Sequence, residues 1–443
     1  MKHNLTEGPI LAGIARFALP YMLAYFLQVL YGLADLYVIG LYCNADATAS
    51  VANGVQVMYM FTVIMIALSM GSTVGIAKAV GAQDHDTLLR TVGNTLTLFI
   101  SLAILCALVM LGLRDPIISA IGTPAGAVDG TADYLTICFI GIPFIVTYNV
   151  IASIFRGLGD TQRPMYFVAI ACAINIILDF LLIGHMGMGP RGAALGTSLS
   201  QALSVVIAAI YMRRHSDVSK LKLSDLRPNR QTTGSILRVG VPVALQDGFI
   251  QLSFMIIMVI ANGRGMTDSA AVGIVEKFIG ILFIVPSAML ATVSAMGAQN
   301  LGAGRRDRAH ATLRAATVIA ISFGTIIAAV MQMIPEKAVA LFTNDQDVIM
   351  MGGGYLKGYV WDCVLAGIHF CFSGYFTAYG LSIISFAHNF TAIVTARIPL
   401  AYLASASYPD TLYPMGLATC TGSLVSVLIC VVVYIVLRRR GTI

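Results

Sequence analysis

Long apolar stretches separated by short polar segments recur along the whole chain. Most of them hold about 20 residues, and an α-helix of that length crosses about 30 Å of hydrocarbon. Unbroken apolar runs such as residues 62–68 and 426–436 lack the alternation that is typical of membrane-spanning strands. The pattern therefore predicts an all-α polytopic membrane protein with twelve transmembrane helices, which start near residues 17, 52, 92, 132, 165, 192, 239, 271, 312, 355, 384 and 415.

Composition and charge agree with this class of protein. The chain of 443 residues is 58% apolar and 11% charged, and its mean hydropathy is +0.85, whereas soluble domains carry about 25% charged residues. Most of its 27 Lys and Arg residues fall in loops on the same side as both termini, so the net charge of +6 forms no single patch that would suit nucleic acid. By the positive-inside rule, both termini are predicted to be cytoplasmic.

The two halves of the chain are related by an internal duplication. Residues pair at an offset of about 221, so that Pro20 corresponds to Pro242 and Gly159 to Gly380. Each half carries six predicted spans, and because six is even, both halves have the same orientation and a cavity is expected between them. The duplication predicts an amino-terminal lobe at 1–213, a cytoplasmic linker at 214–237 and a carboxy-terminal lobe at 238–443.

Two carboxylates, Asp35 and Asp179, lie inside predicted spans of the first half. A charge at the centre of a bilayer costs about 3 kcal/mol on insertion scales, so each carboxylate needs a compensating role. Asn175 precedes Asp179 by four residues and shares its helical face, and Thr197 opens a similar polar face in the sixth span. We expect these faces to converge on one polar cavity, together with Gln28, Tyr31, Asn53, Gln56, Asn149 and Gln201.

Such a cluster can serve ion coupling in two ways. A pair of neighbouring carboxylates can bind and release a proton, and the same oxygens can hold Na⁺, because hard cations take carboxylate, amide and hydroxyl oxygens. The sequence does not separate H⁺ from Na⁺ at Asp35 and Asp179, and no cofactor is expected. The alternative for these residues is a structural one, in which polar side chains only hydrogen-bond neighbouring helices for about 1 to 2 kcal/mol.

Several short motifs occur in a characteristic order along the chain: residues 5–10 (LTEGPI), 17–20 (FALP), 155–164 (FRGLGDTQRP), 192–197 (GAALGT) and 298–304 (AQNLGAG). In their order and spacing, rather than through any one motif, they resemble the multidrug and toxic compound extrusion (MATE) transporters, and among them the bacterial DinF-type branch. The resemblance covers nearly the whole chain. It implies two six-helix lobes in a V around a central cavity, located in the bacterial plasma membrane. It also implies cation-driven export of amphipathic, often cationic, compounds.

The second half also carries carboxylates within its predicted spans. Because related transporters often bind substrate through acidic residues of this lobe, the resemblance makes Glu276 and Asp362 candidates for binding a cationic compound. The alternative is an ion pair with Lys277 or Arg397, since charges within a membrane usually pair. Further candidates for the substrate site are Asp247, Gln251 and His369.

These observations favour a secondary antiporter that exports organic cations in exchange for H⁺ or Na⁺. No Walker A loop and no His-Glu-x-x-His motif occurs in the sequence, so no enzyme activity is expected. The expected partners are small organic cations and membrane lipids, with no nucleic acid, and the chain is predicted to be monomeric. Two alternatives stay open: a flippase for lipid-linked oligosaccharides, which would need more Arg and Lys in its cavity, and a membrane receptor that transports nothing.

Overall fold

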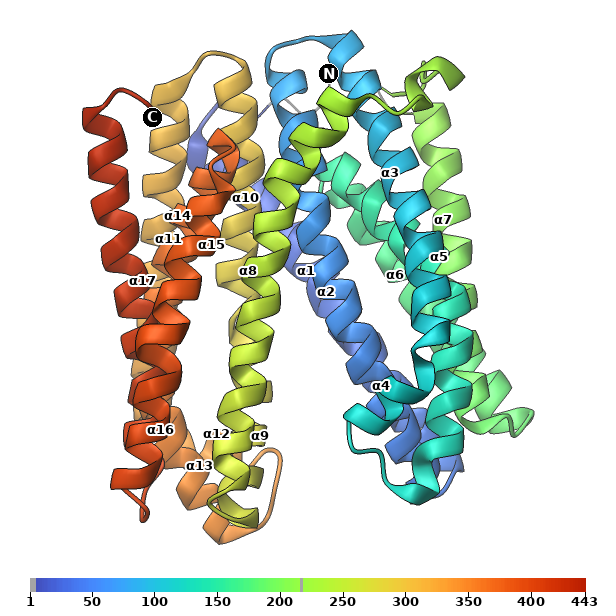
Figure 1. Ribbon diagram of the computed structural model, residues 1–443, viewed down its shortest axis with the longest axis vertical. Helices are drawn as coiled ribbons and strands as arrows, with labels where there is room; N and C mark the ends of the chain where they lie inside the picture. The colour runs from blue at the N-terminus through green and yellow to red at the C-terminus, as the bar shows by residue number, and fades with distance from the viewer. Residues whose placement is uncertain (1–4, 216–217) are drawn as a thin grey trace. The chain divides into compact units, whose positions relative to one another are not determined.

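The computed structural model describes residues 5–215 and 218–443, and within these ranges the chain is helical and contains no strand (Figure 1). This confirms the predicted all-α fold. The α-helices of the first half are α1 (Ile10–Tyr42), α2 (Ala45–Gly81), α3 (His85–Gly112), α4 (Arg114–Ala120), α5 (Val128–Gly157), α6 (Gln162–Asp179) and α7 (Gly189–His215). Those of the second half are α8 (Arg230–Asn262), α9 (Met266–Leu282), α10 (Ile284–Gly302), α11 (Arg306–Met333), α12 (Pro335–Val339), α13 (Gln346–Tyr359), α14 (Asp362–Tyr379), α15 (Ser382–Ala392), α16 (Ile398–Ser407) and α17 (Tyr413–Arg439).

Eleven helical segments of the described chain are long and apolar enough to cross a membrane. The predicted span near residue 355 is not among them, because it is divided into α13 and α14 at Val360 and Trp361. The predicted span near 271 is continuous in hydropathy, but its helix is interrupted at Phe283, between α9 and α10. Pro286 explains that interruption, since its ring clashes with the carbonyl four residues earlier and removes a hydrogen bond.

The described residues form two compact units. One unit contains Leu19–Gly240, and the other contains Leu5–Ala18 together with Val241–Ile443. Each helix that opens a half of the duplicated sequence, α1 and α8, is therefore divided between the units. The division falls beside Pro20 in α1 and beside Pro242 in α8, the two prolines that correspond in the duplication. The compact units thus differ from the predicted lobes in these two opening segments.

The segment predicted as a linker, 214–237, contributes residues that pack on α3 within the first unit. Its short 3₁₀ helix, Leu223–Leu226, lies against Gly93, where an added Cβ would stand only 2.2 Å from a backbone oxygen. Asn94 accepts a hydrogen bond of 2.6 Å from the backbone N–H of Asn229. These contacts tie the described part of the segment to one helix, whereas composition alone indicated a linker.

Polar residues in the loops explain where several helices begin. Asn44 accepts a hydrogen bond from the backbone N–H of Ala47 at 2.9 Å and so caps α2. Asp84 caps α3 in the same way, since it accepts bonds from the N–H of Thr87 at 3.0 Å and from its hydroxyl at 2.6 Å. These bonds favour the ionised carboxylate and lower the pKa of Asp84.

A buried arginine joins two loops in the second unit. Arg264 follows α8, and its guanidinium donates to Asp268 at 2.6 Å and to the carbonyl oxygen of Ser405 at 2.7 Å. It also donates to the carbonyl oxygens of Tyr408, Pro409 and Thr411, in the segment after α16. We expect Arg264→Gln to lower the free energy of unfolding by about 3 kcal/mol, because the buried Asp268 loses its ion-pair partner.

The matched control for this prediction is Arg306→Gln, which removes an exposed guanidinium at the start of α11. Thermal unfolding of both variants in detergent measures the difference. A midpoint for Arg264→Gln equal to that of the control would show that these loops do not depend on Arg264.

Candidate functional site

The structure brings the two carboxylates of the first half together inside the first unit. Asp35 lies in α1 and is 1% exposed, and Asp179 is the last residue of α6 and is 0% exposed. Their carboxyl groups interact directly with each other. A π-helical turn, Phe180–His185, follows Asp179 immediately, and such turns are frequent at functional sites.

Asn175 and Thr197 complete this cluster, which we call the carboxylate cluster: Asp35, Asp179, Asn175 and Thr197. The Thr197 hydroxyl on α7 donates to Asp35 Oδ2 at 3.0 Å, and the Asn175 side chain also interacts with Asp35. Asp35 Oδ1, both carboxylate oxygens of Asp179 and the amide oxygen of Asn175 are buried without a hydrogen-bond partner among the described residues. Since buried oxygens normally have a donor or a cation beside them, this donor set suits a proton or a hard monovalent cation.

Glycines of α7 allow the close packing on which the cluster depends. A Cβ at Gly196 would lie 2.5 Å from Asp179 Oδ1, and one at Gly192 would lie 3.1 Å from the backbone carbon of Leu182 in the π-helical turn. Both glycines belong to the motif at 192–197 that supports the family resemblance. The motif therefore has a local physical reason, because only a residue without a side chain leaves space for the carboxylate.

A second layer of polar side chains surrounds the cluster. Tyr31 interacts electrostatically with Asp35 and lies beside Gln201; the sequence placed both Tyr31 and Gln201 in the polar cavity. Cys138 and Tyr134 on α5 lie within electrostatic range of each other and of Asp35. Sequence reasoning missed Tyr134 and Cys138 as site residues. The sequence feature that could have drawn attention to Tyr134 is the duplication, in which Tyr134 corresponds to Tyr355.

Four other residues predicted for this cavity make no hydrogen bond to the carboxylate cluster among the described residues. Gln28 lines a pocket whose wall includes neither carboxylate. Asn149 is 4% exposed, and its amide donates to the carbonyl oxygen of Ile145 in its own helix at 2.8 Å. On α2, Asn53 is half-buried and Gln56 is exposed, and no hydrogen bond within the described ranges joins either of them to the carboxylate cluster.

The second unit contains a separate group of charges around Arg397. The Arg397 guanidinium donates to the Tyr359 hydroxyl at 2.7 Å and interacts electrostatically with both Glu276 and Asp362. Asp362 is 1% exposed, and neither of its carboxylate oxygens has a hydrogen-bond partner among the described residues, whereas Lys277, the other predicted ion-pair partner, is exposed. Two carboxylates and one guanidinium thus lie within electrostatic range of one another, which leaves a net negative charge in the group when all three are ionised.

The remaining predicted residues of the second half are less closely connected. Asp247 and Gln251 lie one helical turn apart on α8 and are half-buried. His369 is 4% exposed, and its ring packs edge to face on the ring of His388 with centroids 5.7 Å apart. Sequence reasoning missed His388, whose two ring nitrogens hydrogen-bond Ser373 at 2.9 Å and Ser426 at 3.1 Å.

A duplicated helical membrane protein with charged residues buried in its spans is typical of secondary transporters. The MatE family profile matches the chain twice, over residues 20–181 and 242–403. The chain therefore belongs to the MatE family of membrane transporters, the family of multidrug and toxic compound extrusion proteins. The double match confirms the duplication that the sequence predicted, and the DinF-type branch stays a prediction.

Curated relatives agree with this assignment. The chain is 24% identical over 396 residues to the probable multidrug resistance protein YoeA of Bacillus subtilis, which covers 88% of this chain and 86% of that protein. It is also 24% identical over 374 residues to the multidrug export protein MepA of Staphylococcus aureus, with 84% of this chain and 83% of that protein covered. Both relatives are thus named for multidrug resistance or export, in agreement with a transporter of the MATE type.

Solved structures confirm the fold. A crystal structure of a MATE protein in complex with MaL6 has a TM-score of 0.90 and 22% identity, covering 99% of this chain and 97% of that one. An outward-facing multidrug resistance MATE family transporter has a TM-score of 0.89 and 22% identity over the same shares of the two chains. These likenesses support the predicted pair of six-helix lobes.

Proposed function

We propose that this protein is a secondary active antiporter that exports amphipathic organic cations in exchange for H⁺ or Na⁺. The observation that carries the proposal is the carboxylate cluster, in which Asp35 Oδ1 on α1 and both carboxylate oxygens of Asp179 on α6 are buried without a hydrogen-bond partner among the described residues. Multidrug export by relatives such as MepA supports the substrate class. We further propose that the chain is monomeric in the bacterial plasma membrane, with both termini cytoplasmic.

The chemistry of coupling follows from the two carboxylates. When both are ionised, their like charges repel in an environment from which water is largely excluded. A proton shared between Asp35 and Asp179, or a Na⁺ bound by oxygens of Asp179, Asn175 and Asp35, removes that repulsion. An ion that binds one conformation more tightly than another shifts the equilibrium between them, which is the requirement for exchange.

Proteoliposomes with separately imposed gradients test this proposal. We expect an inward gradient of one ion, H⁺ or Na⁺, to drive efflux of a fluorescent organic cation, and the dye gradient to drive ion movement in return. Vesicles without protein are the control. Dye movement that is indifferent to both gradients would overturn the antiport proposal, and movement of a labelled lipid in place of the dye would indicate a flippase.

We propose that Glu276 and Asp362 attract the positive charge of the substrate, with Asp247, Gln251 and His369 as further lining residues. Glu276→Gln and Asp362→Asn should then raise the apparent Kd for a cationic dye by about tenfold, because a charge-assisted contact contributes about 1.5 to 3 kcal/mol. Binding of a neutral compound of similar size should change little. Fluorescence titration in detergent measures both affinities.

The control for these variants is Asp410→Asn, which removes an exposed carboxylate of the same unit. Equal losses for the cationic and the neutral compound would assign the two acids to the structural group around Arg397 instead.

A further inference from the structure

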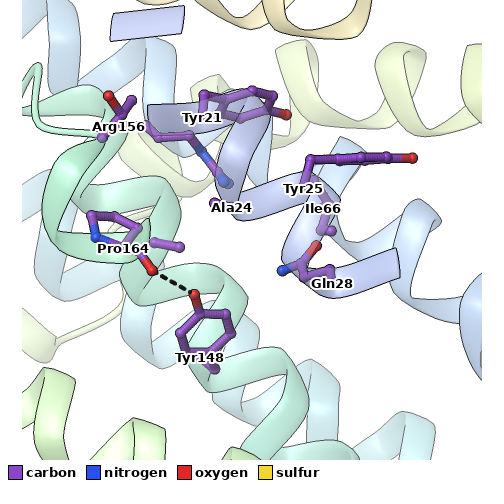
Figure 2. A pocket seen from close by; sticks show the side chains of 10 residues that line it. Tyr21, Ala24, Tyr25, Gln28, Ile66, Tyr148, Arg156 and Pro164 are labelled. Atoms are coloured by element: carbon purple, nitrogen blue, oxygen red, sulfur yellow. Dashed lines mark hydrogen bonds between the residues drawn. The ribbon is translucent and has the colours of Figure 1, made fainter. Parts of the chain in front are cut away.

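A small pocket lies in the first unit, apart from the carboxylate cluster, and a basic residue reaches into it (Figure 2). Its cavity volume is about 30 Å³, enough for a few atoms of a ligand whose remainder lies outside. The walls come from α1, α2, α5 and α6, and they are mostly aromatic or aliphatic. Arg156, in the last turn of α5, provides the only full positive charge among the described lining residues.

Arg156 has no acidic partner in the described part of the chain. Its guanidinium stands 5.7 Å from the centre of the Tyr21 ring, and among the described residues its electrostatic partners are the tyrosine hydroxyls of Tyr21 and Tyr148. The nearest acid along the sequence, Asp160, is paired with Arg163. A ring face attracts a cation by about 0.5 to 1 kcal/mol at such a site and does not neutralise it. The pocket therefore holds an uncompensated positive charge.

The polar lining around Arg156 can donate hydrogen bonds but carries no carboxylate. Figure 2 shows the Arg156 side chain extending below the Tyr21 ring toward Ala24 of α1, with the Gln28 amide on the same helix. The Tyr148 hydroxyl donates to the carbonyl oxygen of Pro164 at 3.1 Å, so its ring is held in the wall. A cationic ligand would meet repulsion here, whereas an anionic group would find a guanidinium and an amide.

We propose that this pocket binds the phosphate group of an anionic amphipathic molecule, with Arg156 as its counter-ion. The planar guanidinium presents paired N–H donors that match phosphate oxygens. The apolar walls, including Ile66 and Ala24, suit the first carbon atoms attached to the phosphate. The pocket carries a positive charge, whereas the proposed site for organic cations carries negative charges. Binding of a ligand in this pocket does not depend on transport activity.

Ligand binding to the purified protein tests the proposal without any ion gradient. The probe is dioctanoyl phosphatidylglycerol, with dioctanoylglycerol, which has the same chains and no phosphate, as one comparison and sodium phosphate as the other. Native mass spectrometry and thermal unfolding report binding. We expect phosphatidylglycerol alone to bind and to raise the unfolding midpoint, and Arg156→Gln to weaken this binding about tenfold or more.

Two further variants keep the test decisive. Arg213→Gln removes an exposed charge of the same unit at the end of α7 and should leave the binding unchanged. Ala24→Leu retains the charge but fills the pocket, and should weaken the binding even if Arg156→Gln does not fold. Equal binding by wild type and Ala24→Leu, equal losses for the two arginine variants, or equal protection by dioctanoylglycerol would overturn the proposal. Equal protection by sodium phosphate would overturn its assignment to an amphipathic ligand.

Discussion

Replacement of Asp35 by asparagine is expected to reduce gradient-driven efflux to the leak rate of vesicles without protein. Asparagine has the size and shape of aspartate, so the hydrogen bond from Thr197 to this position can persist. An amide neither accepts a proton near neutral pH nor carries the negative charge that a cation requires. Asp179→Asn should have the same effect, because the two carboxyl groups act as one site.

The measurement is efflux of a fluorescent cation from proteoliposomes under an imposed proton or sodium gradient. Dye binding in detergent should remain, because the proposed substrate residues lie in the other unit. Asp129→Asn, an exposed carboxylate at the start of α5, is the control and should transport at the wild-type rate. Coupled efflux by both Asp35→Asn and Asp179→Asn at that rate would show that the cluster is structural only.

The main members of this cluster could be predicted from the sequence because a charge in an apolar span is costly. That argument selected Asp35 and Asp179, and helical spacing then added Asn175. Residues of α5 could not be found in this way, because Tyr134 and Cys138 are ordinary side chains of an apolar helix. Only packing of α5 beside α7 gives them a polar environment.

The positions at which helices are interrupted could likewise be predicted from the sequence only in part. Pro286 accounts for the interruption between α9 and α10, because proline removes a backbone donor. The break at Val360 and Trp361 has no proline beside it, and the π-helical turn after Asp179 has no signal in the hydropathy pattern. Arg156 lies in the polar motif at 155–164, yet α5 continues to Gly157 and so places it in a pocket wall.

The polar groups of the two halves share a tyrosine at corresponding positions, although their carboxylates do not correspond. No carboxylate of the second half corresponds to Asp35 or Asp179, yet Tyr134 and Tyr355, which do correspond, each lie within electrostatic range of an acid. In the first unit that acid is Asp35, and in the second it is Glu276. We infer that the duplicated scaffold retained a tyrosine beside an acidic site, while the acids themselves came from different helices in each half.

Gly196→Ala is expected to impair transport strongly while the protein still folds. The added Cβ would stand 2.5 Å from Asp179 Oδ1 and 3.6 Å from Asn175 Nδ2, so the carboxylate must move away from α7. Overpacking of this kind costs about 1 to 3 kcal/mol, and the better helix propensity of alanine offsets up to about 1 kcal/mol of it. The displaced carboxylate no longer faces Asp35, so coupled efflux should fall much more than stability.

Gly40→Ala is the matched control, because a Cβ at that position in α1 meets nothing within 4 Å. It provides the same gain in helix propensity without contact to the cluster, and should transport at the wild-type rate. Efflux from proteoliposomes and thermal unfolding in detergent, measured on both variants, separate loss of function from loss of fold. Wild-type efflux by Gly196→Ala would mean that the position of the Asp179 carboxylate does not determine coupling.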